Sequence, residues 1–308
     1  MENILKVKVI GAGPTGSILA MALASIGISV DLYDPIDLDI ISSQQRSYAI
    51  THSTRNFFEK IGLWKEIIHI INPFENLLVS DQYLKKNNIF TVHDLHADNL
   101  KHEAIGWIVE HTELMRVVSS YLYKSNHINL IKESSTILNN EDYFLSIATD
   151  GKQSTARKLL NIPFTSFKYD QACITFQCLL RGTSASYAYE ILRKEGPLAI
   201  LPLKGDLYQI VWSAPLEVCI KRMELSRSIF LDRFAGALPI NLEPDCIVGK
   251  RRLSKLDFTV SFNLCKGDKI LIGEASHSIH PVGGQGLNLS IRDINCIFDY
   301  FQRIPRNS

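Results

Sequence analysis

Little in this sequence would tie it to a nucleic acid or to an oxidising compartment. Its 308 residues carry a formal net charge of +1, so no basic excess indicates a nucleic-acid partner. Its six cysteines are scattered and include no Cys-x-x-Cys pair, which argues against a zinc ribbon or a disulfide framework. Low-complexity tracts and internal repeats are absent as well. The chain is 46% hydrophobic, enough for a sizeable core, and we expect two lobes in a reducing, cytoplasmic environment.

Long apolar runs are scarce too, and the one exception has another explanation. Residues 9–30 carry no charge, as in a signal peptide or a membrane span. Three glycines and a proline fall in the first half of this run, where they would break an apolar helix. Asp31 and Asp34 follow directly, at the expected end of a strand. We therefore favour a folded segment over a targeting segment.

What the sequence does contain begins with a strand-helix-strand unit. Residues 5–10 and 28–33 have the character of buried strands, and residues 15–26 that of a helix rich in small residues. Gly11-Ala12-Gly13-Pro14-Thr15-Gly16 stands between the first strand and the helix. This arrangement predicts a dinucleotide site in which the free N–H groups of the helix N-terminus face the phosphates.

Four residues of this unit have a physical role in such a site. Gly11 permits the tight turn out of the strand, and Gly16 lets the helix pack close to it. Gly13 has no Cβ, so a pyrophosphate can approach the backbone there. Asp34 is placed to accept hydrogen bonds from both ribose hydroxyls, and it would repel a 2′-phosphate. The site therefore favours FAD or NAD over NADP.

A second glycine-rich segment lies near the other end of the chain. Residues 269–273 return to a buried strand that Glu274 ends, and the loop 281–286 precedes a helix predicted over 287–298. A helix N-terminus beside such a loop can stabilise negative charge on a reduced ring. Two such motifs indicate one long cofactor held from two sides, and FAD fits that description.

Other chemistry in this second segment is not supported. His277 and His280 have no third ligand nearby, so no metal is predicted. Ser276-His277 is not part of a Gly-x-Ser-x-Gly elbow, which argues against a hydrolase.

The middle of the chain follows a different pattern. Turns separate the short apolar runs there, as in an antiparallel sheet, and Asp150-Gly151 taken alone is a hairpin signal. The predicted strands are 172–182, 197–203 and 207–214, the predicted helices are 53–69 and 221–236, and 76–102 suits an exposed hairpin. We expect an α/β fold in which an antiparallel substrate sheet is inserted into a Rossmann-like FAD-binding domain. The expected boundaries are 1–72, 103–165 and 262–308 for the FAD-binding domain, and 73–102 and 166–261 for the substrate domain.

In this order, the segments resemble the FAD-dependent aromatic hydroxylases, the group A flavoprotein monooxygenases. The resemblance is closest to the ubiquinone-biosynthesis hydroxylase branch, with para-hydroxybenzoate hydroxylase more distant. Its most specific part is His-Pro-Val-Gly-Gly-Gln-Gly-Leu-Asn at 280–288, with Arg292-Asp293 close behind. It implies FAD as cofactor, NADH or NADPH as transient electron donor, and hydroxylation of an aromatic small molecule such as a prenylated quinone precursor.

The resemblance also implies roles for individual residues. Arg46 matches an arginine near the flavin and ribityl chain, and Asp150-Gly151 matches a motif that handles FAD and NAD(P)H. The backbone around the 281–286 loop is expected at the flavin ring, with Pro281, Gly284, Gln285 and Gly286 as the catalytic candidates. The implied cofactor-binding residues are Gly11, Gly13, Gly16, Asp34, Arg46, Asp150, Gly151, Glu274, Gly286, Leu287 and Asn288.

Two departures from the family keep other interpretations open. Glu274 stands where the family has an aspartate that holds the ribityl and pyrophosphate region, and the chain stops at Ser308 where the family continues with more helices. We therefore expect truncation, or cover supplied by a partner. The alternatives are a prenyl reductase or halogenase of the same superfamily, and a truncated FAD-binding protein without catalysis. A homodimer and a peripheral association with a membrane or a complex also stay open.

Overall fold

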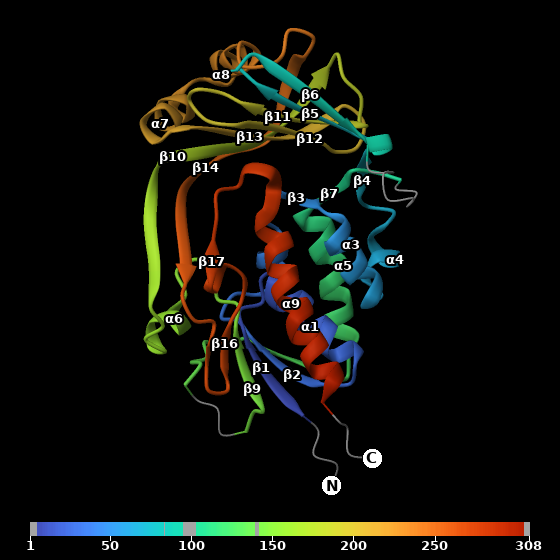
Figure 1. Cartoon of the computed structure of the whole chain (residues 1–308), viewed down its shortest axis with the longest axis vertical. Coiled ribbons are helices and arrows are strands. Elements are labelled where there is room, and N and C mark those ends of the chain that lie inside the picture. Colours follow the sequence, from blue (N-terminus) through green and yellow to red (C-terminus); the bar gives the residue numbers. More distant parts are fainter. Residues whose placement is uncertain (1–4, 83, 95–102, 139–141, 305–308) are drawn as a thin grey trace.

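Two large sheets, with a small sheet at their junction, organise the chain (Figure 1). The computed structural model describes residues 5–82, 84–94, 103–138 and 142–304. In this part of the chain the lower sheet of Figure 1 has six strands and the upper sheet has eight. The predicted fold class, a Rossmann-like domain with an inserted antiparallel sheet, is confirmed, although one pair of strands in the inserted sheet is parallel.

The lower sheet is parallel except at one edge. Its order is β15-β16-β9-β1-β2-β8, and β15 runs antiparallel to β16. The central strand β1 pairs with β2 on one side and β9 on the other, so the residues that follow these three strands meet at one edge of the sheet. The strands are β1 (Lys6–Ile10), β2 (Ser29–Tyr33), β8 (Ile128–Ile131), β9 (Leu145–Ala148), β15 (Cys265–Lys266) and β16 (Lys269–Leu271).

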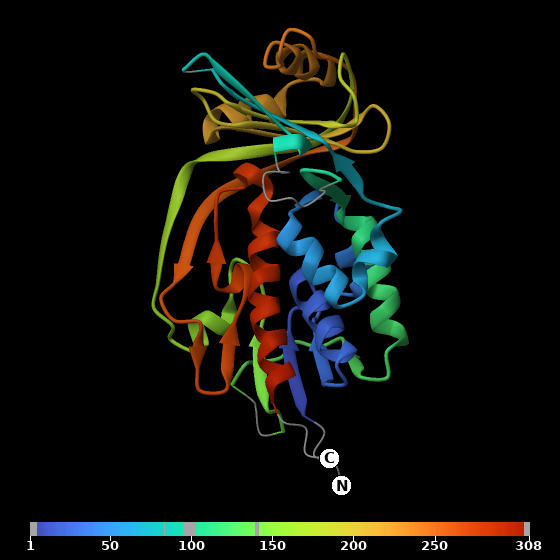
Figure 2. The same ribbon diagram turned by 45° about the vertical axis from the view of Figure 1, so that its right-hand side comes forward.

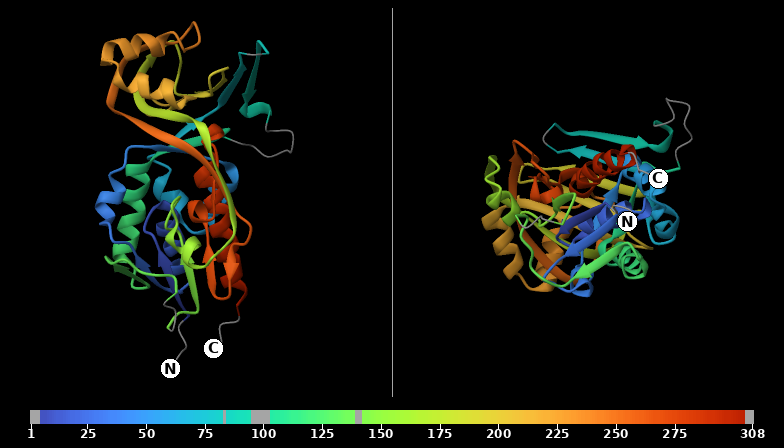
Figure 3. Two further views of the ribbon diagram at one scale, coloured as in Figure 1. Left: turned by 90° about the vertical axis from the view of Figure 1, so that its left-hand side faces the viewer. Right: turned by 90° about the horizontal axis from the view of Figure 1, so that it is seen from below.

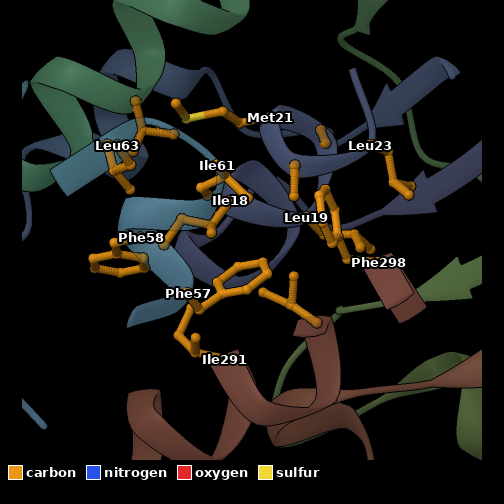
Figure 4. Close-up of a cluster of buried hydrophobic side chains, with 14 of the residues drawn as sticks. Ile18, Leu19, Met21, Leu23, Phe57, Phe58, Ile61, Leu63, Ile291 and Phe298 are labelled. Carbon is orange, nitrogen blue, oxygen red and sulfur yellow. The ribbon is translucent and has the colours of Figure 1, made fainter. Parts of the chain in front are cut away.

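An apolar core joins the two ends of the chain beside this sheet. The helix α1 (Pro14–Ser25) is buried along most of its length and contacts both α5 (His111–Lys124) and α9 (Gln285–Arg303). Figure 4 shows the side chains of the core, with Phe57 close to Phe298 of α9. The centroids of these two rings are 5.7 Å apart, edge to face. This packing places the first glycine motif beside the second.

The helix predicted over 53–69 is two helices. α3 (His52–Lys60) ends and α4 (Leu63–Ile67) begins around Gly62. The prediction was wrong because Gly62 has a φ of 77°, a left-handed conformation that ends an α-helix.

The upper sheet is antiparallel except for one pair. Its order is β17-β14-β10-β13-β12-β11-β5-β6, and β11 runs parallel to β5. The strands are β5 (Asn76–Asp81), β6 (Lys86–Thr91), β10 (Phe164–Arg181), β11 (Tyr187–Leu192), β12 (Leu198–Pro202), β13 (Leu207–Pro215), β14 (Glu243–Ser261) and β17 (His277–Ser278). β5 and β6 form the predicted hairpin, while residues 83 and 95–102 of that prediction lie outside the described residues.

Two helices cover the outer face of the upper sheet (Figure 2). The sequence predicted one helix over 221–236, but α7 (Leu216–Glu224) ends before α8 (Arg227–Ala235) begins. The break follows from Ser226, whose hydroxyl oxygen accepts a hydrogen bond from the Ile229 N–H and caps α8.

The strands β10 and β14 connect the upper sheet to the lower part of the molecule (Figure 3). They are 18 and 19 residues long, whereas the sequence predicted only 172–182 and nothing over 243–261. The missed part of β10 is largely exposed, so no apolar alternation marks it. The short strand β17 pairs with β14 at Thr259 and Val260, which joins the second glycine motif to this ribbon.

The junction between the sheets is built from short elements. A small antiparallel sheet has the order β3-β7-β4. The elements here and around the lower sheet are β3 (Ser47–Ile50), β4 (Asn72–Phe74), β7 (Gly106–Glu110), α2 (Leu38–Ser42), α6 (Thr155–Leu159) and the 3-10 turns η2 (Gly273–Ala275) and η3 (Val282–Gly284). Among the described helices, none has the length and apolar character needed to span a bilayer. The domain boundaries, a homodimer and a peripheral membrane location stay predictions.

Candidate functional site

The first glycine motif forms a tight turn between β1 and α1. Gly11 has a φ of 105°, and a Cβ there would lie 2.6 Å from the Thr149 carbonyl oxygen. A Cβ on Gly16 would lie 1.9 Å from the Gly11 carbonyl oxygen. At Gly13, by contrast, no described atom lies within 4 Å of the Cβ position. Gly11 and Gly16 therefore allow the protein to pack, while Gly13 leaves open space at the start of α1.

Asp34 is fixed beside this turn at the end of β2. Its carboxylate accepts hydrogen bonds from the N–H groups of Ala12 and Ile36, each at 2.8 Å. The side chain borders the same cleft as Gly13. A carboxylate has about four acceptor positions, so acceptor capacity remains for a ligand in the cleft.

The cleft that begins at this turn runs to the start of α9, with a volume of about 270 Å³. Residues of both glycine motifs line it. The predicted cofactor-binding residues that it brings together are Gly11, Gly13, Asp34, Arg46, Asp150, Gly151, Glu274, Gly286 and Leu287. Gly16 is not among its lining residues, because it faces the packed side of the turn.

Asn288 is enclosed by protein instead of lining the cleft. Its Oδ1 accepts a hydrogen bond from the Thr54 hydroxyl at 2.7 Å and from the Thr51 N–H at 3.1 Å. Its Nδ2 donates to the carbonyl oxygens of Ala49 at 2.7 Å and Gly284 at 3.1 Å. The predicted direct contact of Asn288 with the cofactor therefore finds no support in its position. Its bonds hold the first turn of α9 against β3 and α3.

Asp150 and Gly151 lie in the loop before a helix instead of in the hairpin that the sequence suggested. Asp150 Oδ2 accepts hydrogen bonds from the N–H groups of Thr155 at 2.8 Å and Ala156 at 3.0 Å, at the start of α6. The other oxygen of Asp150, Oδ1, is buried and has no hydrogen-bond partner among the described residues. Because Asp150 lines the cleft, this oxygen marks a place for a donor on a ligand.

Glu274 stands at the far end of the cleft on the turn η2. Asp293 of α9 holds this turn, because its Oδ2 accepts the Gly273 N–H at 2.9 Å and lies 2.7 Å from Nε2 of His277. The sequence pattern included Asp293 without giving it a role. Its position two turns into α9 could not be matched to Gly273 before the fold was known.

A second cavity, of about 370 Å³, opens beyond Glu274 toward the inner face of the upper sheet. This volume is within the usual range of small-molecule sites. The cavity and the cleft share Tyr48, Glu274, Gly286 and Leu287, so they meet at one junction. The wall that the sheet contributes is mostly apolar and includes Leu77, Val79, Ala188, Ala199, Leu201 and Val211.

The loop before α9 presents backbone to this second cavity. Of the predicted catalytic residues, Pro281, Gly284 and Gly286 line the cavity, and Gln285 does not. The Gln285 Nε2 turns back to donate to the Gly283 carbonyl oxygen at 3.0 Å. The first N–H groups of α9 have no partners within the helix, so its N-terminus supplies free donors near the junction.

Three side chains at the junction form a network that the sequence did not reveal. The Tyr48 hydroxyl lies 2.8 Å from Nδ1 of His111, and Nε2 of His111 lies 2.8 Å from the Ile41 carbonyl oxygen. Arg46 completes it, with Nε 3.4 Å from Nδ1 of His111. Arg46 and Tyr48 are two residues apart in an extended segment, and that spacing was the available signal.

Glu190 of β11 is the other residue that sequence reasoning missed. It lines the second cavity from the sheet side. The sequence Tyr187–Leu192 shows no alternation of apolar and polar residues, so it gave no signal for the side chain of Glu190.

Comparison with known proteins agrees with this geometry. The family described as FAD binding domain matches residues 5–99 and 142–299. This chain belongs to the FAD-binding domain family. It is a FAD-dependent monooxygenase, and FAD is its cofactor.

Of three similar proteins, two are named hydroxylases and one is uncharacterised. The chain is 28% identical to the uncharacterized protein slr1300 of Synechocystis, with 95% of this chain and 74% of that one covered. It is 25% identical to ubiquinone hydroxylase UbiL of Rhodospirillum rubrum, covering 95% and 71%. It is 22% identical to 3-demethoxyubiquinol 3-hydroxylase of Escherichia coli, covering 96% and 78%.

Solved structures share the fold of this family member. Pseudomonas aeruginosa PqsL in complex with 2-aminobenzoylacetate has a TM-score of 0.79 at 17% identity, over 97% of this chain and 86% of that one. p-Nitrophenol 4-monooxygenase PnpA from Pseudomonas putida has a TM-score of 0.76 at 16% identity, over 97% and 80%.

The residues of the cleft fit FAD. The open space at Gly13 lets a phosphate approach the start of α1, and a side chain there would fill it. The unpaired Oδ1 of Asp150 and the fixed carboxylate of Asp34 offer acceptors for hydroxyl groups of a dinucleotide. These observations come from two separate parts of the chain and agree on one elongated ligand.

Proposed function

We propose that this monooxygenase hydroxylates an aromatic small molecule, using FAD, O₂ and NADH or NADPH. One observation carries the proposal: the polar cleft meets a largely apolar cavity at Tyr48, Glu274, Gly286 and Leu287. A ring in that cavity would lie beside the end of a cofactor in the cleft. The hydroxylase relatives support a phenolic substrate of the quinone-precursor class.

The cleft residues suggest how FAD would be bound. Asp34 would bind the adenosine ribose, and the N–H groups after Gly13 would face the pyrophosphate. Arg46 would lie along the ribityl chain and the edge of the flavin. When bound, FAD supplies the redox chemistry, and the protein positions the substrate and the cofactor.

The start of α9 has a separate role in this proposal. Its glycine loop, with Gly283 and Gly284 both in left-handed conformations, brings backbone close to the ring system. The positive end of the helix dipole would stabilise negative charge there. The apolar sheet wall around Val79, Ala199 and Val211 would keep water out of the reaction space.

We also propose the division of labour between domains. Residues 1–72, 103–165 and 262–308 would form the cofactor domain, and residues 73–102 and 166–261 the substrate domain. Sheet membership supports this proposal, since β5, β6 and β11–β13 belong to the upper sheet and β1, β2, β8 and β9 to the lower one. The exception is β17, which lies within 262–308 but pairs with β14 of the upper sheet.

The experiment uses purified, FAD-loaded protein with NADH or NADPH, O₂ and 2-allylphenol, a short analogue of a prenylated phenol. We expect the phenol to accelerate oxidation of the nicotinamide and the product to gain one oxygen atom, detected by mass spectrometry. Hydrogen peroxide is measured in parallel. Flavin that neither nicotinamide reduces, or complete conversion of the reducing equivalents to peroxide with every phenol tried, would contradict the proposal.

A further inference from the structure

Glu190 is a charged side chain set among apolar neighbours. In the register of the upper sheet it lies opposite Ala199 of β12 and Val79 of β5. All three residues line the second cavity. From the other side, the backbone of Gly283 lies close enough to the Glu190 carboxylate to lower its pKa. The carboxylate thus spans from the sheet wall to the loop that precedes α9.

One oxygen of this carboxylate is left over. Oε1 is buried, and no described residue hydrogen bonds to it. Burial raises the pKa of Glu190, and the backbone of Gly283 acts in the opposite direction. A buried acceptor without a partner costs free energy, so packing within the protein gives no reason for a carboxylate at this position. A ligand that brings a hydrogen-bond donor does.

The other carboxylate in the cavity does not serve the same purpose. Glu274 lines both the cleft and the cavity, and it therefore stands where the cofactor and the substrate site meet. Glu190 lines the second cavity but not the cleft. Among the described residues, the part of the second cavity that lies outside the cleft consequently carries one carboxylate, that of Glu190.

We propose that Glu190 selects for a hydroxyl group on the aromatic substrate, with Oε1 accepting the hydrogen bond from the ring O–H. This inference rests on the function proposed above, because it takes the second cavity as the substrate site. The hydrogen bond fixes the ring between the sheet wall and the glycine loop, and so decides which ring carbon faces the cleft. The bond orients and selects; it transfers no proton.

The test compares two ligands that differ only at the oxygen, 2-allylphenol and its methyl ether 2-allylanisole. Their dissociation constants for FAD-loaded protein are measured from the change in the flavin absorption spectrum. The wild type should prefer the phenol roughly 10- to 100-fold, since a hydrogen bond to a charged group is at stake. Glu190→Leu should abolish the preference. Glu190→Gln should retain part of it, because its amide oxygen still accepts a hydrogen bond.

Glu224→Leu is the matched control, because Glu224 is exposed at the end of α7 on the outer face of the same sheet. This variant should keep the wild-type ratio of the two dissociation constants. A merely structural role for Glu190 would weaken both ligands equally in Glu190→Leu and leave the ratio unchanged, which would overturn the inference. If Glu190→Leu does not fold, Glu190→Gln decides, with a preference reduced several-fold supporting the inference and an unchanged ratio overturning it.

The outcome is separable from that of the proposed function. Oxidation of NADH or NADPH is measured for each variant with and without 2-allylphenol. Wild-type protein that responds to the phenol but prefers neither ligand overturns the role of Glu190 and leaves the function standing. Wild-type protein that neither binds nor responds to any phenol overturns both.

Discussion

The Tyr48 hydroxyl donates a hydrogen bond to Nδ1 of His111 across 2.8 Å. The direction follows from two contacts: Nε2 lies 2.8 Å from the Ile41 carbonyl oxygen and must carry a proton, while Nδ1 accepts a hydrogen bond from Arg46 Nε. The ring is therefore neutral, and burial lowers the pKa of His111 from 6.5 to about 4. His111 is also the first residue of α5, and the positive end of the helix dipole there disfavours a positive charge on its ring. A neutral imidazole thus fastens the junction strand β3 to α5.

A pH dependence of stability follows from this neutral histidine. Between pH 6.5 and about 4 the unfolded chain protonates His111 and the folded chain does not, so the free energy of unfolding falls as the pH falls. The loss from this residue approaches about 3 kcal/mol at most. Denaturant unfolding at pH 7 and pH 5 measures it. His111→Gln should be less stable at pH 7 and show a smaller drop between the two; an equal drop would contradict the assignment.

Substitutions at Gly13 and Gly16 of the first motif should separate cofactor binding from folding. Gly13→Ala places a methyl group in open space, so the free energy of unfolding should barely change while FAD affinity falls at least tenfold. Gly16→Ala places its Cβ 1.9 Å from the Gly11 carbonyl oxygen, so it should destabilise the fold itself. Flavin fluorescence titration and urea unfolding of the two variants give the comparison. Equal loss of stability in both would refute the distinction.

Asp293 should affect FAD binding without touching the cofactor. Asp293→Asn weakens the contacts to Gly273 and His277 that hold the turn bearing Glu274. We expect a loss of about 1–3 kcal/mol in unfolding free energy and a several-fold weaker FAD affinity. Asp299→Asn on the same helix removes a surface ion pair with Lys60 and should cost less than about 1 kcal/mol. Similar effects of the two variants on FAD affinity would argue against the assigned role.

The parts of the site that the sequence revealed depend on local chemistry. The turn at Gly11, the acid at Asp34 and the loop before α9 each lie within a few residues of a strand or helix end. Their chemistry follows from backbone geometry, which a short stretch of sequence encodes. Asp150 was recognised by resemblance, but its cap on α6 was not, because a carboxylate-glycine pair suits both a hairpin and a helix start.

The residues that the sequence did not reveal depend on distant contacts. Tyr48 and His111 are 63 residues apart, and Glu190 and Gly283 come from distant segments that line the same cavity. The periodicity of a single segment cannot indicate a contact between residues that lie so far apart in the sequence. The same reason explains why the structural contact of Asn288 was missed: its side chain joins segments 234 residues apart through Thr54, while its predicted role at the cofactor stays a prediction.

We therefore expect the Asn288 side chain to stabilise the fold, and its loss to disturb the cofactor site indirectly. Asn288→Ala leaves the buried Thr54 hydroxyl and the half-buried Ala49 carbonyl oxygen without their partner. Each unsatisfied group costs roughly 1–3 kcal/mol, so we expect the free energy of unfolding to fall by about 2–5 kcal/mol. Gln302→Ala, at an exposed position of the same helix, should change it by less than about 0.5 kcal/mol.

The effect of Asn288→Ala on FAD tells positioning from direct contact. A residue that contacts the cofactor loses affinity without losing much stability when truncated. A residue that positions the start of α9 loses both, because Gly284 and Ala49 are no longer held together. Urea unfolding measured with and without saturating FAD resolves the two. If the variant keeps its apo stability and loses only FAD affinity, then Asn288 binds the cofactor directly and the buried arrangement is not the working one.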